Sequence, residues 1–243
     1  MLETITIFDD DESAKQKTDR RVTDIKEAVR DKNRVNIYID DKFYCSLDIA
    51  QVVDFGVKIG RVFSEEELTE LKRASDFGKF YTRALEYVFL RPHSTKEIHD
   101  YLKRKTLSKK VRVKNRKTGE YQTKIREGYD PSLVPLVLKR LDERGYLNDH
   151  RFAELWIENR SIKKGISVKK LRNELMKKGV SAQIIDDVLA QDSRDEREEI
   201  RKVIARKINR YDDQQKLIQY LVRQGFNYSD VLDELSAFSP DGA

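Results

Sequence analysis

The side chains that most often carry out catalysis or bind metal ions are few in this sequence. The 243 residues include 3 His and a single Cys, Cys45. His93, His99 and His150 lack the spacing of metal ligands. No Cys or His lies near Cys45 in the sequence to help it bind zinc, and a single Cys excludes an internal disulfide, which fits a reducing compartment. These residues predict neither a catalytic centre nor a metal site.

Nucleotide chemistry and acid–base chemistry are not predicted either. The sequence contains no Walker-type Gly-rich phosphate loop and no Gly-x-Gly-x-x-Gly motif. The acidic run Asp9–Glu12 lacks a second ligand set, and no other pair of carboxylates is singled out by its spacing. A metal-dependent nuclease would need clustered carboxylates, so we expect no cleavage of DNA with Mg²⁺. We therefore expect no cofactor and no enzymatic activity.

The basic side chains are the remaining candidates for contact with a ligand. Lys and Arg number 49 against 43 Asp and Glu, which gives a net charge of +6. The excess lies in residues 77–190, which hold 27 basic and 14 acidic residues, whereas residues 1–76 and 191–243 are net acidic. So basic a segment predicts contact with a polyanion, either nucleic acid or a filament that contains it. The alternative is a set of solvated, Lys- and Glu-rich helices.

The most basic stretch, residues 108–128, has the pattern of a β-hairpin. Hydrophobic and basic residues alternate on both sides of a turn that contains Gly119. We interpret this hairpin as an arm that contacts phosphates, the alternative being a solvated loop. Charge and expected exposure alone select our candidate DNA- or filament-binding residues, in the hairpin and beyond it. They are Lys109, Lys110, Arg112, Lys114, Arg116, Lys117, Lys124, Arg126, Arg160, Lys163, Lys164, Lys169, Arg172, Lys177 and Lys178.

The elements that precede the basic segment predict a small β-rich module over residues 1–76 with a mobile acidic tail. Ile5–Phe8 has the pattern of a short strand, before the acidic run. Three more β patterns are predicted, over Val22–Val29, Arg34–Ile39 and Lys42–Leu47. Asp40-Asp41 is a hairpin turn signal between the last two. Ser64–Glu67 is a capping box that begins a helix predicted to end near Ser75.

From residue 77 onward one helical pattern occurs three times. Ser94, Ser167 and Asp213 each begin a run with apolar residues four and eight positions later. The last two runs end at Gly179 and Gly225, where glycine permits the left-handed conformation that closes a helix. A period near 46 residues with three helices per unit predicts a mainly α chain of three tandem three-helix repeats, an elongated curved stack with the hairpin inserted in the first. The predicted repeats are 77–146, 147–192 and 193–238.

Two local details are predicted within these repeats. Ser94–Glu97 and Ser193–Glu196 have the capping-box pattern at the start of a helix. The apolar stripes of the helices, including the one that contains Trp156, are predicted to form the core.

The same residues resemble a known family. The Gly-Tyr-Leu-Asn-Asp…Phe-Ala block at residues 145–153 is the most specific part of the resemblance. Residues 96–105 and 164–180 match the family's helical pattern, and residues 34–40 resemble its leader module. From about Val22 to Leu235 the chain is similar to the RecX regulatory proteins. One departure is Thr106, followed by the hairpin, where the family usually has a Gly and a tight turn.

The resemblance implies a modulator of the RecA recombinase and no catalytic residues. Such a protein lodges in the groove of the RecA filament, blocks its extension or promotes its disassembly, and so restrains strand exchange, ATP hydrolysis and SOS co-protease activity. It would act in DNA repair and homologous recombination. The alternative function is a helix-turn-helix-like DNA-binding protein that acts without RecA.

The remaining expectations concern partners and location. We expect weak binding to single- or double-stranded DNA without sequence preference, and we expect a monomer. No apolar run approaches the length needed to cross a bilayer, and the N-terminus lacks the pattern of a signal peptide. The expected location is therefore the cytoplasm, with no membrane partner.

Overall fold

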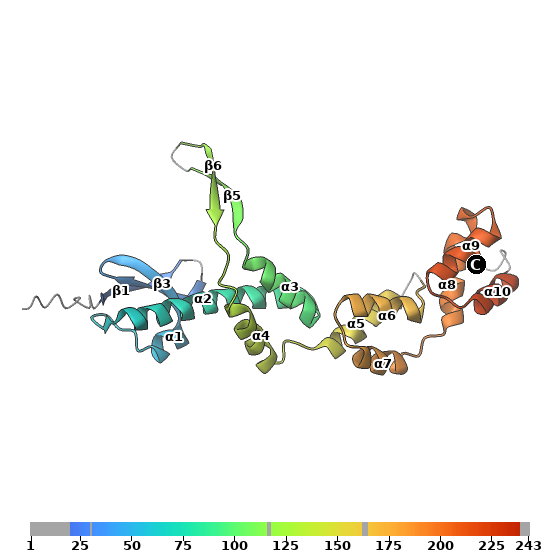
Figure 1. The fold of residues 1–243 in the computed structure, drawn as a ribbon, viewed down its shortest axis with the longest axis horizontal. Coiled ribbons are helices and arrows are strands. Elements are labelled where there is room, and N and C mark those ends of the chain that lie inside the picture. The colour runs from blue at the N-terminus through green and yellow to red at the C-terminus, as the bar shows by residue number, and fades with distance from the viewer. Residues whose placement is uncertain (1–19, 30, 116–117, 162–164, 239–243) are drawn as a thin grey trace, which may run out of the picture. The chain divides into compact units, whose positions relative to one another are not determined.

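The structure is a computed structural model, and it describes residues 20–29, 31–115, 118–161 and 165–238. The strand pattern at Ile5–Phe8 and the acidic run Asp9–Glu12 lie outside the described residues. The chain divides into two compact units, residues 1–82 and 83–243, and each is described by itself. Figure 1 shows the order of the elements.

A four-stranded antiparallel sheet forms the first unit, with the strand order β3-β2-β1-β4. Its strands are β1 (Arg20–Ala28), β2 (Asp31–Ile39), β3 (Lys42–Asp48) and β4 (Val62–Phe63). Strands β1, β2 and β3 confirm the predicted β-rich module. Strand β4 was not predicted, because two residues are too few to show an alternating hydrophobic pattern. Asp40 and Asp41 join β2 to β3 with φ of 49° and 62°, the left-handed values that a tight hairpin turn requires.

The core of this unit lies between the sheet and two helices, α1 (Ile49–Asp54) and α2 (Glu65–Val88). Ile37 and Leu47 of the sheet are fully buried in one cluster with Leu71 of α2. The predicted capping box at the start of α2 is present, because Ser64 N–H donates to Glu67 Oε2 (2.8 Å) and Glu67 N–H donates to Ser64 Oγ (3.2 Å).

The predicted end of this helix near Ser75 is wrong, since α2 is 24 residues long and ends at Val88. The helix passes through Gly78, where a Cβ atom would lie 3.0 Å from Arg34 Nη1. Arg34 is buried beneath the helix and donates hydrogen bonds to Ser46 Oγ (3.3 Å) and to the Ser75 carbonyl (3.4 Å). Gly78 therefore gives the helix room to pass over a buried guanidinium group, and the helix does not end there.

The second unit begins within α2 and is mainly helical. Its further helices are α3 (Thr95–Lys105), α4 (Leu133–Glu143), α5 (Asp149–Ser161), α6 (Val168–Lys177), α7 (Ala182–Gln191), α8 (Glu196–Lys207), α9 (Gln214–Arg223) and α10 (Tyr228–Ala237), with a 3-10 turn, η1 (Ile208–Arg210). Helices α5, α6 and α7 share one core around Leu171 and Leu175. Helices α8, α9 and α10 share another around Ile204 and Leu221.

The same contact between helix ends occurs twice in this unit. Ser94 caps α3 by accepting from Glu97 N–H (3.2 Å), and its hydroxyl donates to the Lys178 carbonyl at the end of α6 (2.7 Å). Ser167 caps α6, and its hydroxyl donates to the Gln224 carbonyl at the end of α9 (2.6 Å). Each serine therefore ties the start of one helix to the end of a later one.

The glycines that follow α6 and α9 allow this approach. Gly179 has a φ of 83° and Gly225 a φ of 97°. A Cβ atom on Gly179 would lie 2.6 Å from the Lys96 side chain, and one on Gly225 would lie 2.7 Å from Ser167 Oγ. Both positions thus require glycine for conformation and for space.

The capping boxes predicted in this unit need correction. At Ser94 only half of the box forms, because the Glu97 carboxylate pairs with Arg91 and Lys178 instead. The box predicted at Ser193 is wrong, since Asp195 caps α8 and accepts from Arg197 N–H (2.9 Å).

In the described residues, no helix combines the length and apolar character of a membrane span.

Candidate functional site

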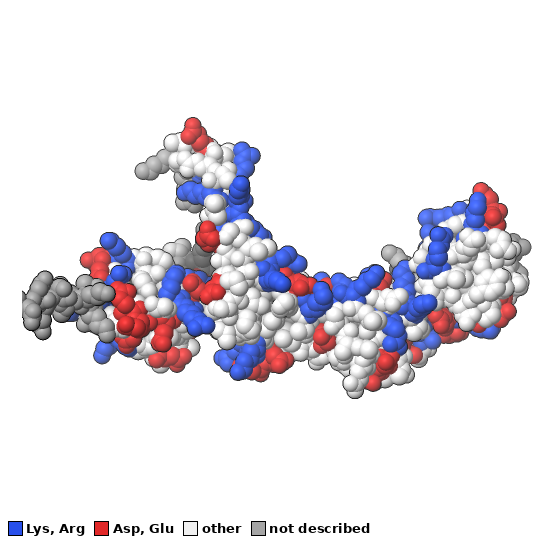
Figure 2. Space-filling model, in the orientation of Figure 1, with Lys and Arg blue, Asp and Glu red and all other residues white. Residues whose placement is uncertain are grey.

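The basic stretch forms a two-stranded antiparallel ribbon of β5 (Lys109–Lys114) and β6 (Tyr121–Arg126). The pairing runs from Lys109 opposite Arg126 to Lys114 opposite Tyr121. All its side chains are exposed except Val111, which is half-buried. Such a ribbon has no core of its own and is marginally stable. Figure 2 shows Lys and Arg side chains gathered on it.

Two glycines shape the ends of the ribbon. Gly119 lies in its turn with a φ of 77°. At the base, Ser108 Oγ donates to Glu127 Oε2 (2.6 Å), and a Cβ atom on Gly128 would lie 2.1 Å from the Thr106 carbonyl oxygen. Gly128 is therefore required where the ribbon leaves α3, a requirement that the sequence pattern did not reveal because it depends on a contact across the base.

The two faces of the ribbon differ in chemistry, because residues opposite one another in the register share a face. The aromatic face consists of Lys110, Arg112 and Lys114 opposite Ile125, Thr123 and Tyr121. The opposite face consists of Lys109, Val111 and Val113 opposite Arg126, Lys124 and Gln122. Each face carries three cations. Arg116 and Lys117, also candidate residues, lie outside the described residues.

The cations of the aromatic face contact the ring of Tyr121. The guanidinium carbon of Arg112 lies 5.3 Å from the ring centroid, and Lys114 Nζ lies 6.0 Å from it. Within the described part of the chain, no cation of the ribbon forms an ion pair with a carboxylate. The ribbon cations are therefore available to an external anion.

The candidate residues of α5 and α6 are engaged differently. The Arg160 guanidinium carbon and Lys178 Nζ lie 4.5 Å and 5.0 Å from the Trp156 ring centroid. Trp156 Nε1–H donates to Glu174 Oε2 (3.1 Å), and Arg160 pairs with the same carboxylate (3.3 Å). The prediction that Trp156 belongs to the core is only partly right, because the indole is half-buried between cations.

The remaining candidates are not gathered at one place. Arg172 forms an ion pair with Asp186, and Lys177 is exposed. A Cβ atom added to Gly225 would lie 3.1 Å from Lys169 Cβ, so the aliphatic part of the Lys169 side chain packs close to the contact between Ser167 and the end of α9. Lys163 and Lys164 lie outside the described residues.

A half-buried carboxylate, predicted from the sequence only as part of a capping box, joins α3 to the end of α6. Glu97 Oε1 accepts from Lys178 Nζ (2.6 Å), and both oxygens accept from Arg91 (3.1 and 3.3 Å). His93 Nδ1 lies 3.3 Å from Glu97 Oε2. Burial alone would raise the pKa of Glu97, but the hydrogen bonds from Arg91 and Lys178 outweigh it and hold the pKa at about 2.

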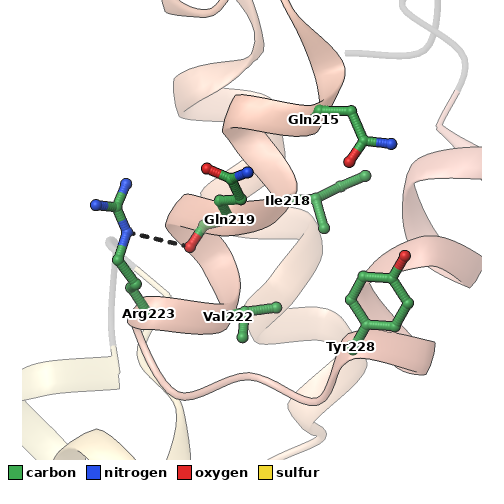
Figure 3. Close-up of a pocket in the computed structure, with 6 residues that line it drawn as sticks. All are labelled: Gln215, Ile218, Gln219, Val222, Arg223 and Tyr228. Carbon is green, nitrogen blue, oxygen red and sulfur yellow. Dashed lines mark hydrogen bonds between the residues drawn. The ribbon is translucent and has the colours of Figure 1, made fainter.

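Two hollows open on the surface of the second unit, each of about 350 Å³. One is lined by Arg91, Pro92, Phe152, Leu155, Trp156, Asn159 and Arg160. The other lies on α9 and the start of α10 and is lined by Gln215, Ile218, Gln219, Val222, Arg223 and Tyr228 (Figure 3). Arg223 Nε there donates to the Gln219 carbonyl (3.3 Å). Among the described residues that line the two hollows there is no Cys, His, Asp or Glu.

Cys45 and His93, the groups most suited to nucleophilic or metal chemistry, are not among the described residues that line the hollows. Cys45 is fully buried in β3, and burial raises the pKa of its thiol to about 11. Among the described residues, no three His, Cys, Asp or Glu side chains are placed to hold a metal ion. His93 is buried against the Tyr87 ring, where burial lowers its pKa.

Two family models match the chain. The model for the second three-helix domain of RecX matches residues 148–189, which contain most of α5, α6 and α7. The model for the N-terminal domain of regulatory protein RecX matches residues 20–64, which contain the sheet of the first unit.

Relatives with the same description match most of the chain. Regulatory protein RecX of Bacillus licheniformis is 28% identical over 232 residues, which cover 91% of this chain and 80% of that protein. Regulatory protein RecX of Clostridium perfringens is 28% identical over 217 residues, which cover 86% and 91%. A solved crystal structure of regulatory protein RecX has the same fold, with a TM-score of 0.67 and 21% identity over 88% of this chain and 99% of that one.

Within the described residues, the fold and the site define a mainly helical protein with an N-terminal β-sheet module and a basic surface as its candidate site. The matches of both parts of the chain give this class a name. Both matched parts, and most of the chain's length, are similar to the RecX family of regulatory proteins.

Proposed function

We propose that this protein is a non-enzymatic regulator that binds the RecA nucleoprotein filament and restrains it, by blocking its extension or promoting its disassembly. The similarity to RecX regulatory proteins over most of the chain is the observation that carries this proposal. The resemblance seen in the sequence, above all the block at residues 145–153, implies RecA as the partner. Recombination, RecA ATPase activity and SOS co-protease activity would all be restrained, in the cytoplasm and by a monomer.

The surface chemistry supports a partner that contains nucleic acid. Six cations of the ribbon are exposed on a structure of only two strands, and within the described residues they lack carboxylate partners. Phosphates would meet them without first breaking an ion pair, with release of counterions. The proposed contact set is the full group of fifteen candidate residues, of which the described ribbon members are all exposed.

The architecture in this proposal is a β-rich module, residues 1–76, followed by three tandem repeats at 77–146, 147–192 and 193–238, which form an elongated curved stack. The ribbon would be an insertion, residues 108–128, in the first repeat. The recurrence of the Ser94 and Ser167 contacts, each with a glycine at the same place, supports a repeated unit. Such a stack would offer a long surface that suits a helical partner.

RecA-catalysed strand exchange and ATP hydrolysis, measured with and without substoichiometric protein, test the proposal directly. We expect both activities to fall at protein concentrations well below that of RecA, since action at filament ends or grooves affects many subunits. Undiminished activities at equimolar protein would contradict the proposal.

The contribution of the ribbon has its own test. In a variant with Lys114, Arg116, Lys117 and Lys124 replaced by Ala, we expect weaker binding to DNA or to DNA-bound filaments. The slope of log affinity against log salt should flatten by about 0.7–0.9 for each phosphate that the variant no longer neutralises. An unchanged slope would remove the ribbon from the proposed site. The thermal transition serves as the control, because exposed substitutions change stability by about 0.5 kcal/mol or less.

The helix-turn-helix-like alternative predicts a different result. A protein of that kind binds a preferred DNA sequence about a thousand-fold or more above random DNA. We expect binding to DNA alone that is weak, steeply salt-dependent and nearly indifferent to sequence. A large preference for one sequence selected from random DNA would favour the alternative.

A further inference from the structure

The aromatic face of the ribbon exposes large apolar side chains that have no core to join. Tyr121 is 61% exposed and Ile125 64% exposed. Exposed apolar groups on an isolated two-stranded ribbon weaken its solubility without stabilising it, so a partner that covers them is expected. Arg112 and Lys114 lie over the Tyr121 ring, at 5.3 and 6.0 Å from its centroid, so this face combines an exposed aromatic ring with two cations in contact with it.

The cations of this face form a regular row. Lys110, Arg112 and Lys114 are alternate residues of β5, so their Cα atoms are spaced by about 7 Å along the strand. This step is close to the distance between successive phosphates of an extended nucleic acid strand, which such a row can follow. On the opposite face the three cations are divided between the strands, with Lys109 on β5 and the other two on β6. Only the aromatic face therefore combines a row of cations with a ring.

These features fit a single strand better than a duplex. In a duplex the faces of the bases are covered by their neighbours, and a side chain meets only base edges and phosphates. In a single strand the bases are free to stack on an aromatic ring, while cations contact the backbone. The exposed Tyr121 ring, with Arg112 and Lys114 next to it, can therefore stack on a base of a single strand but not on a base within a duplex.

We propose that the aromatic face of the ribbon binds single-stranded nucleic acid, with a base stacked on Tyr121 and the backbone phosphates on Lys110, Arg112 and Lys114. This inference rests on the proposed function, because it names the component of the nucleoprotein partner that the ribbon contacts. It goes further by assigning one face, one aromatic side chain and the strandedness of the ligand. The opposite face adds only its electrostatic attraction.

Two variants with equal charge changes separate the faces. The aromatic-face variant is Lys110→Gln, Arg112→Gln and Lys114→Gln, and the opposite-face variant is Lys109→Gln, Lys124→Gln and Arg126→Gln. Binding of the full chain to a fluorescent thymidine oligonucleotide, and to a duplex of the same length, is measured by anisotropy without RecA. We expect the aromatic-face variant to lose at least several-fold more single-strand affinity than its matched control. Equal losses would overturn the assignment of the face.

Substitutions of Tyr121 test stacking. Tyr121→Val retains a residue that favours strands but removes the ring, whereas Tyr121→Phe retains the ring. We expect Y121V to weaken single-strand binding about 5- to 150-fold, with Y121F near the wild type and duplex binding little changed for both. Unchanged single-strand affinity in Y121V, or an equal loss for the duplex, would overturn the proposal. Amide hydrogen exchange of β5 and β6 verifies that the ribbon is intact in both variants.

The outcome is distinguishable from that of the RecA experiments. RecA is absent from these binding measurements. If the aromatic-face substitutions do not selectively weaken single-strand binding, the proposed role of the aromatic face is refuted, but the proposed inhibition of strand exchange is not. Conversely, a protein that leaves RecA undisturbed but binds single strands through Tyr121 refutes the proposed function and supports the face.

Discussion

Replacement of Glu97 by Gln is expected to weaken the contact between α3 and the end of α6 in a strongly pH-dependent manner. The pKa of Glu97 is held at about 2 instead of 4.5, which corresponds to about 3 kcal/mol of stabilisation of the folded state by the ionised carboxylate. Glu97 is only 15% exposed, but its partners Arg91 and Lys178 are 49% and 31% exposed. Screening by solvent at these partners reduces the expected loss at neutral pH to about 2 kcal/mol.

The direction of the pH dependence follows from the lowered pKa. Because the folded state binds the proton of Glu97 less readily than the unfolded state, the stabilisation is complete above about pH 4.5 and is lost as the pH falls to about 2. Gln resembles the protonated acid, so E97Q and the wild type should differ most at pH 7 and converge near pH 2. Comparison at each pH cancels the titration of groups that both proteins share.

The measurement is denaturant-induced unfolding of the two proteins between pH 7 and pH 2, with Glu120→Gln as the control. Glu120 is an exposed residue next to the turn of the ribbon, and its replacement should leave stability unchanged. A difference between wild type and E97Q that is below about 0.5 kcal/mol at pH 7, or one that does not shrink on acidification, would refute the electrostatic account of this contact.

Three further predictions follow from contacts in the structure. Gly179→Ala should cost at least 1 kcal/mol more than Gly145→Ala in denaturant unfolding, because both have positive φ but only the Cβ atom at 179 meets a side chain of α3; equal costs would contradict the close approach. Ser167→Ala should cost about 2 kcal/mol against about 1 kcal/mol for Ser181→Ala, since both residues cap helices but only Ser167 also bonds the carbonyl at the end of α9. Cys45 should resist a thiol reagent at pH 8 in the native protein and react upon unfolding, because it is fully buried with a pKa raised to about 11; rapid native reaction would place the thiol at the surface.

The sequence predicted elements wherever a periodic pattern or a turn signal was strong. The β patterns before and after Asp40-Asp41 and the apolar runs after Ser94 and Ser167 became strands and helices close to their expected bounds. Where the outcome depended on a distant side chain, prediction failed. Gly78 lies inside α2 where Arg34 approaches the helix, and Arg34 belongs to another element and was not identifiable as buried from its charge.

The candidate site was predictable to a similar extent. The alternation of basic and apolar residues identified the ribbon. Which side chains share a face could be assigned only from the register of β5 and β6 in the structure. Charge alone could not separate solvent-exposed cations from those that form ion pairs, because the partners of Arg160 and Arg172 lie on other helices. The ion-pair role of Glu97 was missed for the same reason, since Lys178 is 81 residues away in the sequence.

The basic excess of residues 77–190 therefore overstates the charge available to a polyanion. A cation such as Lys178 or Arg160 must give up a carboxylate and an aromatic contact before it can meet a phosphate, which offsets much of the gain. Within the described residues a cation on the ribbon has no carboxylate to give up, and only Arg112 and Lys114 have an aromatic contact, with Tyr121. The salt dependence of nucleic acid binding should consequently follow the number of ribbon cations, and removal of the ribbon charges should reduce it more than removal of the same number of charges from α5 and α6.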